Sequence, residues 1–225
     1  MNHFTVGGLL ATLLLVACQT TAPAQTGKNA QDIPGNLVRV DNSSAKLAYV
    51  DPAANFSKYT AILLTPLGVD NVEIIQPSTS VTTTGKRNWE LTDADKQKLQ
   101  QDFREAMSKQ LSGGGYTLVD TAGDHVLQIS AMLTRIAPNA PKDDYRSRPT
   151  GRSKVFSEGG GDMSVAVTFS DADTREVLAL AKDTRSGSSM WGLNTSVTNA
   201  AEVRRMFEAW AMQIRAQLDR VRKEE

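Results

Sequence analysis

Hydrophobic positions recur with the period of a β-strand over several stretches of the chain. Residues 125–136 alternate between apolar and polar side chains, which predicts a strand with one covered face and one wetter face. Residues 163–169 alternate in the same way, and residues 176–182 return after an aspartate-rich turn, which predicts a β-hairpin. Residues 59–66 form a short apolar run that ends at a proline, a pattern typical of a strand buried on both faces. Three shorter segments are candidates for edge or docking strands: 37–40, 69–75 and 116–119.

Two other stretches space their apolar residues three and four apart, which predicts amphipathic helices. The first begins at Thr92, with Asp95 in the reciprocal capping position, and ends at the glycines 113–115. The second begins at Asn199, with Glu202 as its reciprocal partner, and runs to the basic C-terminal end of the chain. The two apolar stripes consist of Leu99, Phe103, Ala106, Met107, Gln110 and Leu111 in the first helix, and Val203, Met206, Phe207, Trp210, Ile214, Leu218 and Val221 in the second.

These elements predict an α+β fold. We expect a mostly antiparallel sheet of about four to five strands, with two amphipathic helices packed on one face.

An uncharged apolar run at residues 6–17 precedes Cys18, the single cysteine of the chain. The run has the length of a signal-peptide core and is too short to span a bilayer as a helix. Leu15, Val16 and Ala17 before Cys18 resemble the lipobox of bacterial lipoproteins, in which the cysteine sulfur is acylated before cleavage makes it the first residue. Two or three acyl chains of the palmitate type give stable anchoring. The alternative is an ordinary secretory signal followed by a free thiol, because residues 1–4 contain no Lys or Arg.

The sequence therefore predicts three regions. Residues 1–17 are a lipoprotein signal peptide, residues 18–45 are the acylated Cys18 and a flexible tether, and residues 46–225 are a single periplasmic α+β domain. Gln19 follows the cysteine, where Asp would resemble a signal for retention in the inner membrane. We therefore expect the anchor in the inner leaflet of the outer membrane.

Charge does not direct the chain toward a polyanion. The 25 Lys and Arg residues balance 25 Asp and Glu residues, so no overall field attracts nucleic acid, and no nucleic-acid partner is expected. One cysteine allows no intramolecular disulfide.

Several short segments follow one another in a characteristic order. They are LAYVDP at 47–52, the strand at 59–66, GGG at 159–161, DADT at 171–174, FEAWA at 207–211 and LD at 218–219. In this order they resemble an uncharacterised family of bacterial lipoproteins, domain of unknown function 3313, from about Leu37 to Arg222. Arg175 departs from the family pattern, because the hairpin turn usually has glycine there. The resemblance implies no reaction, cofactor or catalytic residue.

The residues themselves predict no catalytic, cofactor or metal site. His125 adjoins Asp124, but neighbours on a strand point to opposite faces, so we expect an ordinary strand-edge histidine. Asp171 and Asp173 lack the rest of a calcium loop, and a hairpin turn built with Asp side chains is the expected role. The two glycine runs lack the Lys-Ser or Lys-Thr pair of a phosphate-binding loop.

Two loops are candidates for partner binding. Arg146, Arg148 and Arg152 stand in a basic loop that would grip phosphate groups of a lipid or an acidic partner through forked contacts, and the alternative is a solvated loop. Trp191 stands in a loop of Ser, Asn and Thr residues, where an exposed tryptophan would be a binding anchor. The alternative is a tryptophan folded back over the core.

The leading hypothesis is a non-enzymatic envelope lipoprotein, anchored in the membrane through Cys18, that binds another envelope component. That component is a protein of an assembly or transport complex, or a glycan or lipid. One alternative is a hydrolase of cell-wall or lipid material, which predicts a deep pocket with two acidic side chains. The other is a structural or stress-related envelope protein with no dedicated site.

Overall fold

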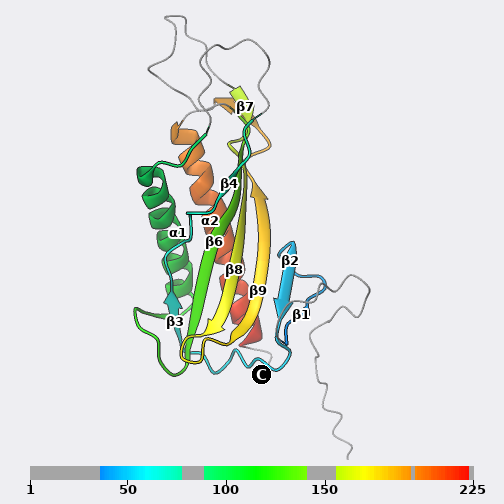
Figure 1. The fold of residues 1–225 in the computed structure, drawn as a ribbon, viewed down its shortest axis with the longest axis vertical. Coiled ribbons are helices and arrows are strands. Elements are labelled where there is room, and N and C mark those ends of the chain that lie inside the picture. The colour runs from blue at the N-terminus through cyan, green and yellow to red at the C-terminus, as the bar shows by residue number, and fades with distance from the viewer. Residues whose placement is uncertain (1–35, 78–88, 141–155, 194–195, 223–225) are drawn as a thin grey trace, which may run out of the picture.

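The computed structural model describes residues 36–77, 89–140, 156–193 and 196–222, which form strands and two helices (Figure 1). The strands are β1 (Val38–Arg39), β2 (Leu47–Val50), β3 (Ala61–Leu64), β4 (Glu73–Ile74), β5 (Thr117–Val119), β6 (Val126–Pro138), β7 (Phe156–Glu158), β8 (Gly161–Asp171), β9 (Val177–Ser186) and β10 (Trp191–Leu193). The helices are α1 (Asp93–Gly113) and α2 (Ser196–Val221).

Eight of these strands form one mixed sheet in the order β1-β2-β9-β8-β6-β3-β5, with β4 paired to the C-terminal part of β6. The prediction of about four to five mostly antiparallel strands is wrong in size and in pairing. β3 lies parallel to both β5 and β6, and β4 is also parallel to β6. A parallel pair needs a crossover connection, and α1 supplies it between β3 and β5.

The antiparallel centre of the sheet confirms the predicted alternation and the predicted hairpin. β6 pairs with β8, and β8 pairs with β9 across the turn that follows Asp171. β3 is less buried than its apolar sequence predicts, because only Ile62 among its residues is fully buried. The buried face of β6 consists of Leu127, Ile129, Ala131 and Leu133.

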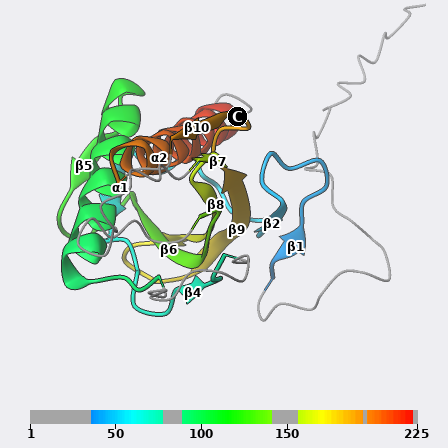
Figure 2. The ribbon, with the colours of Figure 1, turned by 90° about the horizontal axis from the view of Figure 1, so that it is seen from above.

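Both helices lie on one side of the curved sheet, as the sequence predicts (Figure 2). The Thr92 hydroxyl accepts a hydrogen bond from the Asp95 amide at 3.2 Å, and the Asp95 carboxylate accepts one from the Thr92 amide at 3.0 Å. The predicted reciprocal cap of α1 is therefore confirmed. The helices meet through Phe103 and Phe207, whose ring centroids are 5.6 Å apart in an edge-on arrangement. These two side chains are almost completely buried and stand at the centre of the core.

The predicted cap of α2 is wrong. The helix already begins at Ser196, so Asn199 and Glu202 lie inside its first two turns. The Glu202 carboxylate accepts a hydrogen bond from the Gly160 amide, just before β8, and is therefore used to join α2 to the sheet.

The predicted irregular stretches 137–161 and 186–198 contain a second, two-stranded sheet in which β10 pairs with β7. Each of these strands has three residues, too few for alternation to reveal them. Segment 37–40 joins the main sheet through β1. Neither described helix combines the length and the apolar composition needed to cross a bilayer.

Candidate functional site

The side chains that the sheet presents to the helices become smaller toward β2. β6 and β8 present large side chains to the helices, whereas β9 presents Ala179 and Ala181 on the same face. Ala48 of β2 is paired with Ala181 and continues this row of alanines. Because alanine has no side chain beyond Cβ, the sheet and α2 do not fill the space between them here.

The resulting space is a cavity of about 450 Å³, which we call the alanine-walled cavity. Its volume falls within the range of small-molecule sites, roughly 300–1,000 Å³. Its wall on α2 is formed by apolar side chains of the C-terminal half of the helix, and Phe56 and Phe169 close it further. The apolar residues from α2 are Ile214, Leu218 and Val221.

The loop between β1 and β2 forms one side of this cavity. Residues 40–45 contribute to its lining, and Ser44 fastens the loop to the helix. The Ser44 hydroxyl accepts hydrogen bonds from the side-chain amides of Gln213 at 3.0 Å and Gln217 at 3.3 Å. The alanine-walled cavity is therefore bounded by a loop that two side-chain contacts attach to α2.

Few charged side chains reach the cavity. Asp41 and Arg220 are the charged residues of its lining. Tyr49 also belongs to the lining, and its buried hydroxyl has no hydrogen-bond partner among the residues described. Tyr49 follows Ala48 in β2, so its side chain lies on the opposite face of the sheet from the alanines.

A second hollow lies where β9 passes the N-terminal half of α2, and we call it the β9–α2 groove. Its volume is about 430 Å³. Arg185 lies in its floor and forms an ion pair with Asp183, with 3.6 Å between Nε and Oδ2, while its guanidinium also donates to Gln213. The lining residues are Thr184, Arg185, Ser186, Gly187, Ser188, Glu202, Arg205, Met206 and Ala209.

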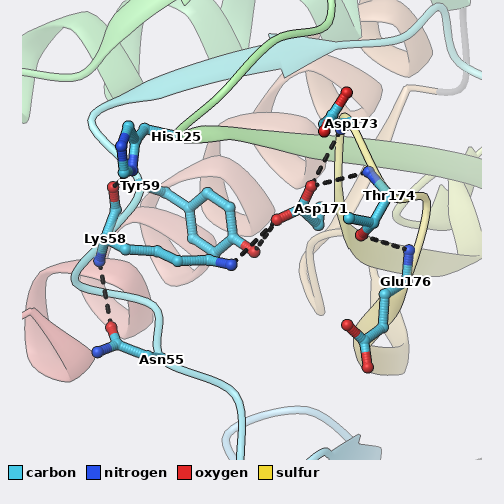
Figure 3. A network of polar contacts seen from close by, with 8 residues as sticks. All are labelled: Asn55, Lys58, Tyr59, His125, Asp171, Asp173, Thr174 and Glu176. Carbon is cyan, nitrogen blue, oxygen red and sulfur yellow. Dashed lines mark hydrogen bonds and ion pairs between the residues drawn. The ribbon is translucent and has the colours of Figure 1, made fainter.

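At the opposite end of the sheet a buried carboxylate organises the β8–β9 turn (Figure 3). Asp171 accepts hydrogen bonds from the backbone amides of Asp173 at 3.0 Å and Thr174 at 3.1 Å. The Tyr59 hydroxyl donates to the same carboxylate at 2.8 Å, and the Lys58 ammonium does so at 3.1 Å. The predicted Asp-built hairpin turn is confirmed, and the network ties the turn to the segment before β3.

The electrostatics of this network favour an ionised Asp171. The hydrogen bond from the Thr174 amide lowers the pKa of the Asp171 carboxyl well below its usual value, and those from Tyr59, Lys58 and the Asp173 amide lower it further against the effect of burial. Burial raises the pKa of the Tyr59 phenol, as does its hydrogen bond to Asp171. A carboxylate that is ionised and a phenol that is neutral at neutral pH suit a structural contact, whereas acid–base catalysis needs groups that titrate near neutrality.

Arg175 ends the same turn with φ of 63°, in the left-handed region. A side chain in this region costs about 1–2 kcal/mol, which a glycine would avoid. We expect Arg175→Gly to raise the free energy of unfolding by about 0.5–1 kcal/mol after the greater freedom of glycine in the unfolded chain is offset. Urea unfolding would measure this. Asn42→Gly is the control, since Asn42 has φ of 56° but asparagine tolerates that region, and equal gains in both variants would contradict the strain at Arg175.

Most of the residues that the sequence predicts to be functional lie outside the part of the chain that the structure describes. Cys18, Arg146, Arg148 and Arg152 lie outside the described residues. Trp191 lies in β10, paired with Glu158 of β7. His125 precedes β6 with its Nδ1 3.1 Å from the Lys58 carbonyl oxygen, as expected of a strand-edge histidine.

The residues around the two hollows were not evident from the sequence as functional residues. Alternation identifies Ala179 and Ala181 as members of one strand face, but only the pairing of β9 with β2 places Ala48 beside them. The β9–α2 groove depends on where β2 ends along β9, which no local pattern indicates.

The hydrolase alternative requires two acidic side chains in one pocket. Asp41 is the acidic residue that lines the alanine-walled cavity, and Glu202 is the one that lines the β9–α2 groove, so neither of these two hollows holds a carboxylate pair. Within the described ranges, no group of three or more His, Cys, Asp and Glu side chains is arranged to hold a metal ion.

The comparison of the sequence with known families confirms the resemblance drawn above. The model of the family "Protein of unknown function (DUF3313)" matches residues 36–214, and the chain belongs to this family. No curated protein matches the chain in sequence.

Several solved structures are similar to this chain at low identity. A Xanthomonas campestris protein of the family DUF330 is 9% identical, with 74% of this chain and 87% of that chain covered and a TM-score of 0.45. The PelC dodecamer from Paraburkholderia phytofirmans is 13% identical, with coverage of 67% and 88% and a TM-score of 0.33. A minor lipoprotein from Acinetobacter baumannii is 13% identical, with coverage of 71% and 94% and a TM-score of 0.30. These likenesses do not extend to a ligand, a partner or a reaction.

Proposed function

We propose that this member of the family is a lipid-anchored protein of the bacterial envelope that binds an acyl-chain-bearing envelope component in the alanine-walled cavity. Its anchor is the acylated Cys18, held in the inner leaflet of the outer membrane, and its folded region faces the periplasm. The lipobox-like residues 15–18 and the absence of any other cysteine support the anchor.

The observation that carries the binding half of the proposal is the cavity itself. The cavity opens to solvent where exposed residues such as Ser44 and Arg220 line it, and its volume of about 450 Å³ is large enough for a small molecule. Its mainly apolar lining offers water few hydrogen bonds, whereas an acyl chain gains about 0.8 kcal/mol for each methylene that it buries there. The lining therefore favours hydrocarbon over water or a sugar.

The polar residues of the lining suit the head of such a molecule. Arg220 is exposed and would contact a carboxylate or phosphate head group through a charge-assisted hydrogen bond. Among the described residues, the loop at 40–45 is joined to α2 by hydrogen bonds between side chains, so parting it from the helix would not break the sheet. Ligand would then enter beside the loop, with its chain against the alanines.

The experiment is photolabelling of the full chain, reconstituted in phospholipid vesicles, with a fatty acid that carries a diazirine in its chain. We expect adducts within residues 40–50 or 213–221, mapped by mass spectrometry. Ala181→Leu places a larger side chain in the cavity and is expected to reduce this labelling about tenfold, the equivalent of about 1.4 kcal/mol.

Ala166→Leu is the matched control. Ala166 lies on β8 next to Lys182 in the ladder, on the face of the sheet that points away from the helices, so the same substitution should leave labelling unchanged. Equal labelling of the two variants would contradict the proposed cavity. The anchor needs a separate test in cells, where Cys18→Ser is expected to move the protein out of the membrane fraction.

A further inference from the structure

β9 is longer than the strand that covers its outer edge. β2 pairs only with residues from Ala179 to Lys182, while β9 continues to Ser186 (Figure 1). Within the described part of the chain, residues 183–186 of β9 therefore have a ladder on the β8 side and none on the other. Such an open edge presents backbone donors and acceptors that another strand can use.

The direction of these backbone groups follows from two hydrogen bonds. The Gly187 amide donates to the Gly161 carbonyl at 2.8 Å, so the groups of Gly187 and of alternate residues before it point toward β8. The Ala48 carbonyl accepts a hydrogen bond from the amide of Val40, the residue after β1, so the neighbours of Ala48 in β2 are the ones that bond to β9. By the same alternation, Thr184 and Ser186 point their N–H and C=O groups toward the open edge.

The open edge borders the β9–α2 groove rather than bare solvent. Thr184 and Ser186 line one side of the groove, and Met206 and Ala209 of α2 line the other. A groove between an exposed strand edge and a helix suits an extended peptide, since backbone pairing supplies affinity and alternate side chains enter the groove.

The charges along the groove select the kind of peptide. Glu202 is buried and its carboxylate is already bonded to the Gly160 amide. Arg185 is already engaged by Asp183 and Gln213, whereas Arg205 is exposed on α2. Arg205 is therefore the charged group of the lining that is placed to contact a ligand, which favours an acidic side chain in the groove.

We infer that an extended acidic segment of another polypeptide adds to β9 as a further strand, between Thr184–Ser186 and α2. The segment bonds to the backbone of Thr184 and Ser186, and one of its acidic side chains contacts Arg205. This site is separate from the alanine-walled cavity, so it does not depend on the proposed acyl ligand.

The test uses the full chain in detergent micelles and a short fluorescein-labelled peptide of alternating valine and aspartate, with binding followed by fluorescence anisotropy. Saturable binding of this peptide is expected, with the lysine counterpart at least about tenfold weaker. Thr184→Pro removes the edge-facing N–H while keeping the β8 ladder, and should weaken binding about fivefold or more. Thr184→Ala loses the same hydroxyl but keeps the N–H, so it should stay within about twofold of the parent.

A second measurement leaves the protein unchanged, in case proline disturbs the strand. Two versions of the peptide are N-methylated on one or the other set of alternate amides, and only one of them should lose binding. Equal binding by both, no saturable binding of the aspartate peptide, or equal weakening by the two Thr184 variants would overturn the inference. Dimerisation through this edge without peptide, seen as concentration-dependent exchange protection at Thr184 and Ser186, would also overturn it, because the occupant would then be a second copy.

Discussion

Replacing Asp171 with alanine is expected to lower the free energy of unfolding at neutral pH by about 3 kcal/mol. The carboxylate is buried and satisfies two backbone amides of the turn and the hydroxyl of Tyr59, which is itself almost completely buried. Its removal leaves these donors without an acceptor in places that water reaches poorly. Lys58 contributes less, because nearly half of its side chain is exposed.

The same contact has a defined pH dependence. The folded-state pKa of Asp171 lies below its ordinary value of 3.8, so the stability it contributes is present above that value and is lost as the pH falls. Urea unfolding between about pH 3 and pH 8 should show a constant difference between the parent and Asp171→Ala above about pH 5, and a smaller one below about pH 4.

Asp173→Ala is the control for this series. Asp173 is exposed and contributes only its backbone amide to the network, so its substitution should change stability by no more than about 0.5 kcal/mol. An Asp171→Ala loss as small as this would mean that the turn and Tyr59 find other partners.

Gly161→Ala is expected to cost about 3 kcal/mol or more. Gly161 opens β8 opposite Pro138 of β6 with φ of 118°, a conformation that is essentially restricted to glycine. A Cβ at this position would lie 2.2 Å from the carbonyl oxygen of Ala137, so the backbones of β6 and β8 would have to separate. The melting temperature and the urea midpoint should both fall.

Gly113→Ala makes the same chemical change without the same consequence. A Cβ there has nothing within 4 Å, and the position is the last residue of α1, where alanine is the better helix former. The variant should be as stable as the parent or slightly more so. A comparable loss in both variants would show that general flexibility, rather than the approach to Ala137, makes glycine necessary at Gly161.

The elements that the sequence predicts well are those in which a local pattern repeats. β6 and β8 are long enough for alternation to identify their buried faces, and α1 has both an apolar stripe and a complete cap. The reciprocal cap assigned to Asn199 and Glu202 follows the same rule and is wrong, because Gly160 from a distant segment takes the Glu202 carboxylate. Local patterns are reliable where no tertiary contact competes for the same side chain.

Strand order and the two hollows depend on contacts between distant segments. The hydrophobic pattern of an apolar strand such as β3 is the same whether its neighbours are parallel or antiparallel. The mixed sheet therefore could not be predicted from that pattern. Alanines in β2 and β9 look like ordinary strand residues until the register brings them onto one face. The candidate cavity thus arises from small residues that carry no chemical signature of their own.

The way the chain enters the domain has a mechanical consequence. β1 is attached to β2 by two residue pairs, Val38 with Val50 and Arg39 with Tyr49, and the next segment along the chain is the loop held at Ser44. A pulling load from the N-terminal side of the chain is therefore expected to act on this short strand and on the Ser44 contacts before it reaches the longer central strands.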